Sequence, residues 1–187
     1  MPRIFIAALL YALLSQSAAA AEWRVANADS HIAFHGSMLG VPVTGYFTKF
    51  ESQIDFDPDD LEGAHLSILI DMTAVNTAHE ERDTALKLPE WFAVQSYAQA
   101  KFTATRFRRT GDGAFEAIGS LTVKGMEKDI TLPFSLAIDG DTAVVSGSID
   151  LNRRDFNIGD GDWANDRLVA FDVRVEFKIV AARVCPQ

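Results

Sequence analysis

Apolar and polar residues alternate strictly along several stretches of this chain, and this period of two sets the kind of fold that the chain can adopt. Between residues 171 and 179 every odd position is apolar and every even position is charged. Between residues 130 and 138 the large apolar residues occupy the even positions. Successive side chains of a β-strand point to opposite faces of a sheet, so the alternation predicts strands with one dry face and one wet face.

The same pattern predicts further strands at regular intervals. They are expected near residues 23–27, 31–36, 43–57, 65–71, 100–108, 115–124 and 142–151. Turn residues separate them, for example Asp57-Pro58-Asp59-Asp60 and Asp139-Gly140-Asp141. Strands at this spacing favour an all-β fold, either an antiparallel sandwich or a barrel.

One segment breaks the alternation and predicts a helical insertion. Thr77 and Glu80 have the spacing of a capping box, in which the first side chain caps the helix. Asp83 and Lys87 follow at i, i+4 spacing on one helix face. Pro89 is expected to end this helix and to suit the first turn of another. An insertion of about 20 residues is long for a barrel loop, and long loops tend to be functional.

The first 21 residues have the pattern of a secretory signal peptide. Arg3 is their only charge, residues 4–14 form a short apolar run, and the segment ends in Ala19-Ala20-Ala21. We expect cleavage before Glu22, which leaves residues 22–187 as one domain in the periplasm. An N-terminal membrane anchor is the alternative, although no stop-transfer flank follows the apolar run.

Charge and cysteine content limit the partners. The chain carries a formal net charge of −9, which argues against nucleic acid and against electrostatic docking on anionic membranes. No later segment is apolar enough for stable membrane insertion. Cys185 is the single cysteine, so no internal disulfide is possible. It is either an inert thiol or one half of an intermolecular disulfide.

The motifs of familiar enzyme and metal sites are missing from the sequence. It contains no G-x-S-x-G, P-loop, H-E-x-x-H or C-x-x-C pattern. The histidines are scattered, at His31, His35, His65 and His79. The run from Asp160 begins like a calcium loop, but Ala164 and Phe171 stand where oxygen ligands belong. We therefore predict no catalytic residue and no metal site.

Basic residues in two places have two possible roles. Arg153 and Arg154 fit either a salt-bridged strand end or a guanidinium at a barrel mouth, where its planar fork suits a phosphate or a polar ring oxygen. Arg82 and Lys87 on the expected helix have the same alternatives, a solvated face or a place near a ligand's head group.

A series of motifs, in order along nearly the whole mature chain, resembles the YceI family of polyisoprenoid-binding proteins. They are Asp29-Ser30-His31-Ile32-Ala33-Phe34, Val43-Thr44-Gly45-Tyr46-Phe47, Ile54-Asp55-Phe56-Asp57-Pro58, Ala100-Lys101-Phe102-Thr103-Ala104, Gly119-Ser120-Leu121-Thr122-Val123-Lys124-Gly125 and Asn152-Arg153-Arg154-Asp155-Phe156. Two positions depart from the family pattern: Asn157 replaces a glycine, and Tyr97-Ala98 replaces Tyr-Pro.

The resemblance implies a lipocalin-like antiparallel barrel of about eight strands with one short helical insertion. It also implies a binding protein rather than an enzyme, with no covalent cofactor and a bound isoprenoid lipid. That lipid would be a polyprenyl phosphate or an isoprenoid quinone, held or carried in the periplasm. The run Gly159-Asp160-Gly161-Asp162-Trp163 resembles a subgroup associated with b-type cytochromes of the membrane. A quinone-presenting accessory of such a redox protein is therefore an alternative, and a periplasmic hydrolase or isomerase is another.

The inward rows of the strands supply the predicted lipid site. The apolar wall is expected to contain Phe34, Phe47, Leu66, Ile68, Ile70, Trp91, Phe92, Phe102, Phe115, Leu121, Leu132, Phe134, Val173, Val175 and Phe177. Arg82, Lys87 and Arg153 are expected near the head group. Trp91 and Phe92 would form a lid or, alternatively, plug one end of the core. A fully packed barrel without a cavity remains the other possibility.

Overall fold

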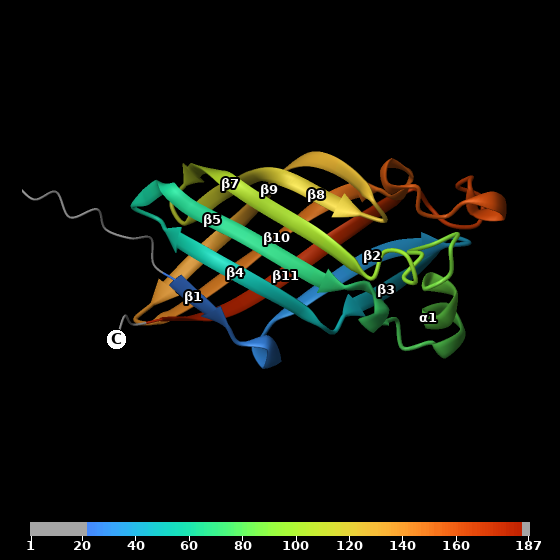
Figure 1. Ribbon diagram of the computed structural model, residues 1–187, viewed down its shortest axis with the longest axis horizontal. Coiled ribbons are helices and arrows are strands. Elements are labelled where there is room, and N and C mark those ends of the chain that lie inside the picture. The colour runs from blue at the N-terminus through green and yellow to red at the C-terminus, as the bar shows by residue number, and fades with distance from the viewer. Residues whose placement is uncertain (1–21, 185–187) are drawn as a thin grey trace, which may run out of the picture.

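The computed structural model describes residues 22–184, in which one antiparallel sheet closes on itself (Figure 1). The closed ring runs β1, β4, β5, β7, β8, β9, β10 and β11, and β1 pairs with β11 to complete it. These strands are β1 (Glu22–Val25), β4 (Phe50–Asp57), β5 (Asp60–Asp71), β7 (Gln99–Gly111), β8 (Ala114–Val123), β9 (Met126–Asp139), β10 (Thr142–Asn152) and β11 (Asp172–Arg183). The predicted antiparallel barrel of eight strands is confirmed. The expected signal peptide and Cys185 lie outside the described residues.

Three further strands extend the ring toward one end. They are β2 (His31–Met38), β3 (Val41–Phe47) and β6 (Val75–Asn76). β1 and β2 both pair with β11 and so form one interrupted line, with η1 (Asn27–Asp29) between them. β3 pairs with β2 while β4 pairs with β1, so residues 43–57, expected as one strand, belong to two strands that are interrupted at Thr48 and Lys49.

The two ends of the barrel differ in their connections. Short turns at residues 57–60, 111–114 and 139–142 close one end. The other end carries residues 72–98 and 153–171, together with the tip of the β2–β3 hairpin. Within these long connections lie η2 (Met72–Ala74), α1 (Glu80–Leu86), η3 (Arg153–Phe156) and η4 (Gly161–Trp163). Figure 1 shows α1 at the end of the barrel opposite the C-terminus.

The helical insertion is shorter than predicted and is capped differently. His79, not Thr77, is the N-cap of α1. Ala78 has a left-handed backbone with φ 57°, which separates Thr77 from the helix. Thr77 instead donates its backbone N–H and its hydroxyl to Asp83 Oδ1, at 2.8 and 2.5 Å, so Asp83 is held by Thr77 and not by the expected pair with Lys87. Residues 88–97 form turns instead of a second helix.

An aromatic cluster plugs the end with the short turns. Phe115 packs against Phe56 and Phe134, with ring centroids 5.5 Å apart in both pairs. Trp23 of β1 joins them and donates its indole N–H to the carbonyl of Phe56 at 2.9 Å. The barrel is thus packed solid at this end.

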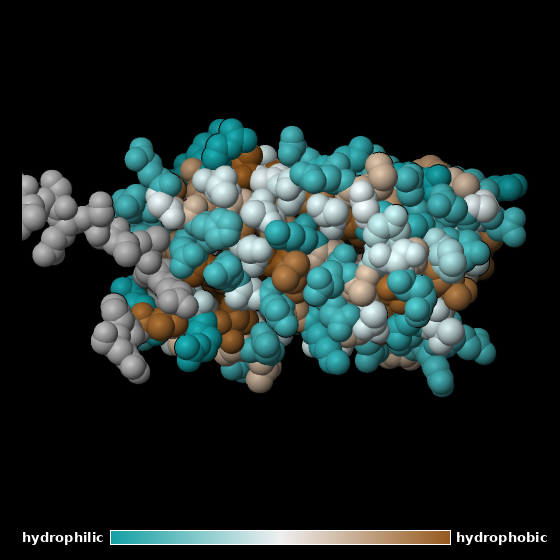
Figure 2. Space-filling model, viewed as in Figure 1, coloured by the Kyte–Doolittle hydropathy of each residue, from teal (hydrophilic) through white to brown (hydrophobic). Residues whose placement is uncertain are grey.

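The side of the barrel that Figure 2 shows is mainly hydrophilic, with separated apolar areas. Cross-strand pairs contribute to the outer surface of the barrel. Arg174 of β11, for example, donates to both carboxylate oxygens of Asp150 on β10, at 2.7 and 2.9 Å. Within residues 22–184, none of the helices combines the length and the apolar composition needed to span a membrane.

Candidate functional site: a one-ended apolar cavity

The barrel encloses a cavity of about 570 Å³ between the aromatic plug and the end with the long connections. Its wall is built from the inward rows of the strands, as the alternating pattern requires. The residues that reach its mouth come from the β2–β3 hairpin, α1 and the 153–171 connection, among them Met38, Arg82 and Trp163. The volume lies within the range of about 300–1,000 Å³ that is typical of small-molecule sites.

All but one of the apolar residues predicted for the wall line this cavity. They are Phe34, Phe47, Leu66, Ile68, Ile70, Trp91, Phe92, Phe102, Leu121, Leu132, Phe134, Val173, Val175 and Phe177. Phe115 is the exception: it is only 2% exposed and belongs to the plug. The period of two indicates which face a residue occupies, but the depth at which packing ends and open space begins depends on the neighbouring strands.

Trp163 is the main lining residue that the sequence analysis missed. It lies on η4, in the run that begins like a calcium loop, and its ring centroid is 5.4 Å from that of Trp91. Both indoles line the cavity from different long connections. A tryptophan in an otherwise acidic and glycine-rich loop is the signal that was available for it. Two indoles therefore lie together at the mouth, and their role as a lid stays a prediction.

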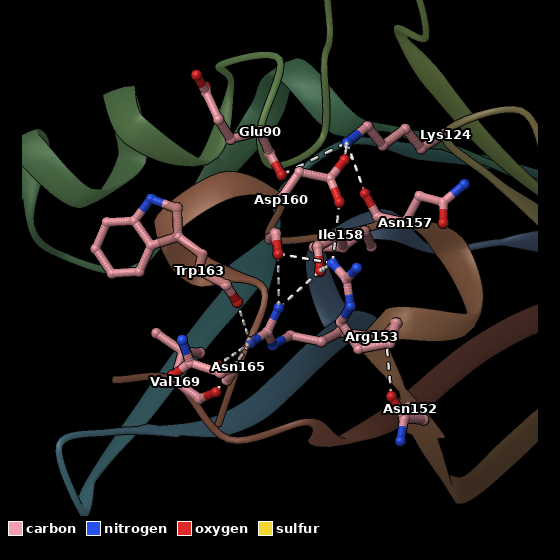
Figure 3. Close-up of polar contacts among 12 residues, drawn as sticks. Glu90, Lys124, Asn152, Arg153, Asn157, Ile158, Asp160, Trp163, Asn165 and Val169 are labelled. Carbon is pink, nitrogen blue, oxygen red and sulfur yellow. Dashed lines mark hydrogen bonds and ion pairs between the residues drawn. The ribbon is translucent and has the colours of Figure 1, made fainter. Parts of the chain in front are cut away.

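Arg153 holds the 153–171 connection in place from inside (Figure 3). Its side chain is buried, with 3% of the residue exposed. The guanidinium donates to six backbone carbonyls at 2.7–3.3 Å. The accepting residues are Ile158, Gly159, Trp163, Asn165, Val169 and Ala170. It also lies over the ring of Phe171, 5.2 Å from the centroid.

These contacts use every N–H of the Arg153 guanidinium, which has five donors. Burial lowers the pKa of Arg153, and the nearby charge of Arg154 acts in the same direction, while Asp160 and Asp166 oppose the shift. A ligand's head group would have to displace a carbonyl to reach this cation. The geometry makes Arg153 the organiser of the mouth; its predicted contact with a head group stays a prediction.

A polar latch joins the two long connections. Asp160 accepts from Arg154 Nη1 at 3.0 Å and from Lys124 Nζ at 3.5 Å. The carbonyl of Glu90 accepts from the backbone N–H groups of Gly159 and Asp160, at 2.7 and 3.0 Å. The hydrogen bond from Arg154 is the largest cause that lowers the pKa of Asp160, and Lys124 adds to the effect. The latch thus ties together the segments that carry Trp91 and Trp163.

The other two basic residues predicted for the head group lie differently. Arg82 lines the cavity, and its Nε and Nη2 donate to the hydroxyl and carbonyl oxygens of Thr77 at 2.8 and 3.0 Å. Its Nη1 has no hydrogen-bond partner among residues 22–184. Lys87 does not line the cavity but a separate surface depression beside Thr48 and Asp83. Of the three basic residues predicted for the head group, Arg82 alone therefore presents a donor group at the mouth that has no partner within residues 22–184.

The calcium-like run is organised by cations of the protein itself. The carboxylate of Asp160 faces Arg154 and Lys124, and the carbonyls of the run face Arg153. Among residues 22–184, no three His, Cys, Asp or Glu side chains are grouped closely enough to hold a metal ion. His35 lies on the outer face, where Nδ1 is 3.1 Å from the hydroxyl of Thr44.

Comparison with known proteins yields a consistent set of relatives. The YceI-like domain model matches residues 23–181. A UPF0312 protein of Yersinia enterocolitica is 30% identical over 151 residues, which are 76% of this chain and 78% of the relative. A UPF0312 protein of Serratia proteamaculans is 32% identical over 131 residues, which are 68% of each chain.

Solved structures share the fold. BcnA of Burkholderia cenocepacia superposes with a TM-score of 0.82 and 28% identity, over 85% of this chain and all of that one. A polyisoprenoid-binding domain from Saccharophagus degradans has a TM-score of 0.69 and 17% identity, over 89% of this chain and 100% of that one. At 17% identity the second likeness concerns the fold alone.

Proposed function

Because this chain belongs to the YceI-like family, we propose that it holds one long isoprenoid lipid in the barrel cavity and carries it in the periplasm. The observation that carries the proposal is the one-ended apolar cavity. A linear hydrocarbon tail enters at the mouth and meets the aromatic plug at the other end. The polar lining residues His79, Glu81 and Arg82 come from α1 and its cap, where a head group would remain.

The energetics of such a ligand favour a carrier. Burial of each methylene contributes about 0.8 kcal/mol, so each five-carbon isoprene unit contributes about 3–4 kcal/mol relative to water. A few units therefore approach the practical affinity ceiling of about 18–21 kcal/mol. Release into free water would be too slow to be useful. The lipid must be exchanged with a membrane or with another protein.

The charges at the mouth favour an uncharged head group. A phosphate is usually held by several charge-assisted donors. Here Arg153 is occupied by carbonyls, Lys87 is outside the cavity, and Arg82 sits beside Glu81 at the mouth. We therefore favour an isoprenoid quinone over a polyprenyl phosphate. A quinone held in this way also suits presentation to a membrane redox protein.

The identity of the ligand is tested by purifying the protein without detergent. Native mass spectrometry should show a complex with one lipid, and organic extraction should release an isoprenoid, with quinones exceeding polyprenyl phosphates. Protein denatured and washed with solvent before refolding is the control and should bind added ubiquinone-2, a short isoprenoid quinone. Refolded protein that binds neither ubiquinone-2 nor a polyprenol would overturn the proposal.

A further inference from the structure

The tip of the β2–β3 hairpin exposes aliphatic side chains beside the cavity mouth. Leu39 and Val41 are 65% and 63% exposed, and Met38 and Leu168 are each 37% exposed. Leu168 belongs to the tip because its carbonyl accepts from the backbone N–H of Leu39 at 2.7 Å. Four exposed aliphatic residues in one place are more than scattered surface apolar residues.

The turn at this tip has an unusual residue for its backbone. Leu39 and Gly40 both have positive φ angles, 51° and 78°, between the paired residues Met38 and Val41. Asn-Gly or Asp-Gly is the usual choice for such a two-residue turn, since a left-handed backbone is unfavourable for a side chain like leucine. Leu39 is neither buried nor favourable in this turn. A contribution to the stability of the fold therefore does not explain why a leucine occupies this position.

The apolar tip is continuous with the wall of the cavity. The inward row of β2 runs through Phe34 and Gly36, both in the wall, to Met38. In β3 the row that contains Val43 ends at Val41, opposite Met38. The cavity surface therefore extends past the barrel rim onto the exposed hairpin, and an emerging lipid tail meets apolar surface along its whole path.

The tip also lacks charge in an acidic protein. Residues 36–47 and 168–171 contain no Asp, Glu, Lys or Arg, although the whole chain carries −9. Its strands are paired up to the turn, because β2 pairs with β3 as far as Met38 and Val41, and Ala170 donates its N–H to the carbonyl of Ser37 at 2.9 Å. An uncharged tip whose flanking strands are paired suits contact with the boundary between head groups and hydrocarbon.

We propose that this tip, made of Met38, Leu39, Val41 and Leu168, inserts reversibly into the surface of a zwitterionic phospholipid bilayer and places the cavity mouth against it. This docking rests on the proposed function, because its purpose is lipid exchange. With the mouth against the bilayer, a long lipid is exchanged without crossing water. A protein partner fits less well. A stable protein interface needs about 800 Å² per partner. An aromatic side chain buries about 150–250 Å², and the four residues of the tip are smaller and already partly buried, so together they fall short of that area.

The test uses Leu39→Asn, which removes the apolar side chain and supplies the residue that the turn prefers. Flotation with phosphatidylcholine vesicles should show a partition coefficient that falls about tenfold, as expected when one leucine is no longer buried. The affinity for ubiquinone-2, measured by tryptophan quenching, should stay within about twofold of the wild type, because Leu39 does not line the cavity.

Ile138→Asn is the matched control. Ile138 is 38% exposed and lies next to the short β9–β10 turn, at the opposite end of the barrel. It should bind vesicles as the wild type does. Vesicles that contain phosphatidylglycerol should bind the wild type more weakly, because the protein is acidic.

The outcomes separate docking from lipid holding. Three results would overturn the docking proposal. The wild type does not bind phosphatidylcholine vesicles, it binds only when phosphatidylglycerol is present, or Leu39→Asn binds vesicles as well as the wild type does. Dimerisation that Leu39→Asn abolishes, without vesicle binding, would assign the tip to a second copy of this chain and would also overturn it. Vesicle binding that depends on Leu39, in a protein that takes up neither ubiquinone-2 nor a polyprenol, would leave docking standing and remove the proposed function.

Discussion

Arg153 shows how one residue can organise the mouth of the barrel. A buried arginine is normally paired with a carboxylate, but here six carbonyls of one connection surround it. The planar fork suits this arrangement, since its donors diverge in fixed directions. The connection has little regular structure of its own, so its shape depends on this one side chain.

Replacing Arg153 by methionine should therefore be costly. The change leaves several carbonyls without their donor at a buried position, and each buried acceptor that loses its partner costs about 1–3 kcal/mol. Arg153→Lys keeps the charge but not the fork, so it should also destabilise the protein, though less. Urea unfolding curves measure both effects.

The control for this pair is Arg167→Met in the same connection. Arg167 is exposed and its side chain donates only to Asn165 Oδ1, at 3.3 Å. Its replacement should change the free energy of unfolding by no more than about 0.5 kcal/mol. Wild-type stability in Arg153→Lys would show that the fork is not needed.

At the scale of elements, the part of the latch that depends on pH is the Asp160 carboxylate, which pairs with Arg154 of the same connection and with Lys124 of the β8–β9 turn. Arg154 and Lys124 lower the pKa of this carboxyl in the folded protein below its ordinary value of 3.8. A lowered carboxyl pKa stabilises the folded latch above the ordinary value, and this stabilisation is lost as the pH falls through the folded value. The latch should thus be intact at neutral pH and weaken in acid below about pH 4.

This pH dependence is measurable as the rate of limited proteolysis within residues 153–171, using a protease that is active in acid. Cleavage should accelerate as the pH falls below 4 in the wild type. Asp160→Asn should be cleaved rapidly at every pH, because it has lost the charge that pairs with Arg154. Asp162→Asn, an exposed neighbour in η4, should retain the wild-type profile. A wild-type profile in Asp160→Asn as well would exclude the latch.

For the molecule as a whole, the open cavity means that a substitution at Gly36 should reduce ligand binding without reducing the stability of the fold. An added Cβ there would meet only Val173 Cγ2, at 4.0 Å, and the residue lines the cavity near the mouth. Gly36→Phe should fill the neck without strain and greatly reduce uptake of ubiquinone-2. The melting temperature should stay equal or rise, since glycine inside a strand costs about 0.5–1 kcal/mol relative to alanine.

Gly119→Ala provides the contrast, because tight packing surrounds that position. Its Cβ would lie 2.0 Å from the carbonyl oxygen of Thr103 on β7, so the backbone would have to move. This variant should melt at a lower temperature than the wild type. A large loss of stability in Gly36→Phe, with ubiquinone-2 binding retained, would mean that the neck is packed and that the lipid takes another route.

The barrel and most of its wall could be predicted from the sequence because both follow from local geometry. Side chains alternate rigidly along a strand, so the inward rows of β9 and β11 are visible as a period of two. The order of the motifs along the chain also indicates the YceI-like family.

Only the tertiary structure decided where the barrel is open and what organises its mouth. Phe115 and Phe134 have the same strand pattern, yet only Phe134 borders the cavity, because the plug is set by contacts among strands that are distant in sequence. Thr77 binds Asp83 instead of capping α1, and Arg153 binds carbonyls up to Ala170. The periodicity of the sequence does not predict such partners. Hydrogen bonds in irregular segments depend on which residues the tertiary fold brings close together.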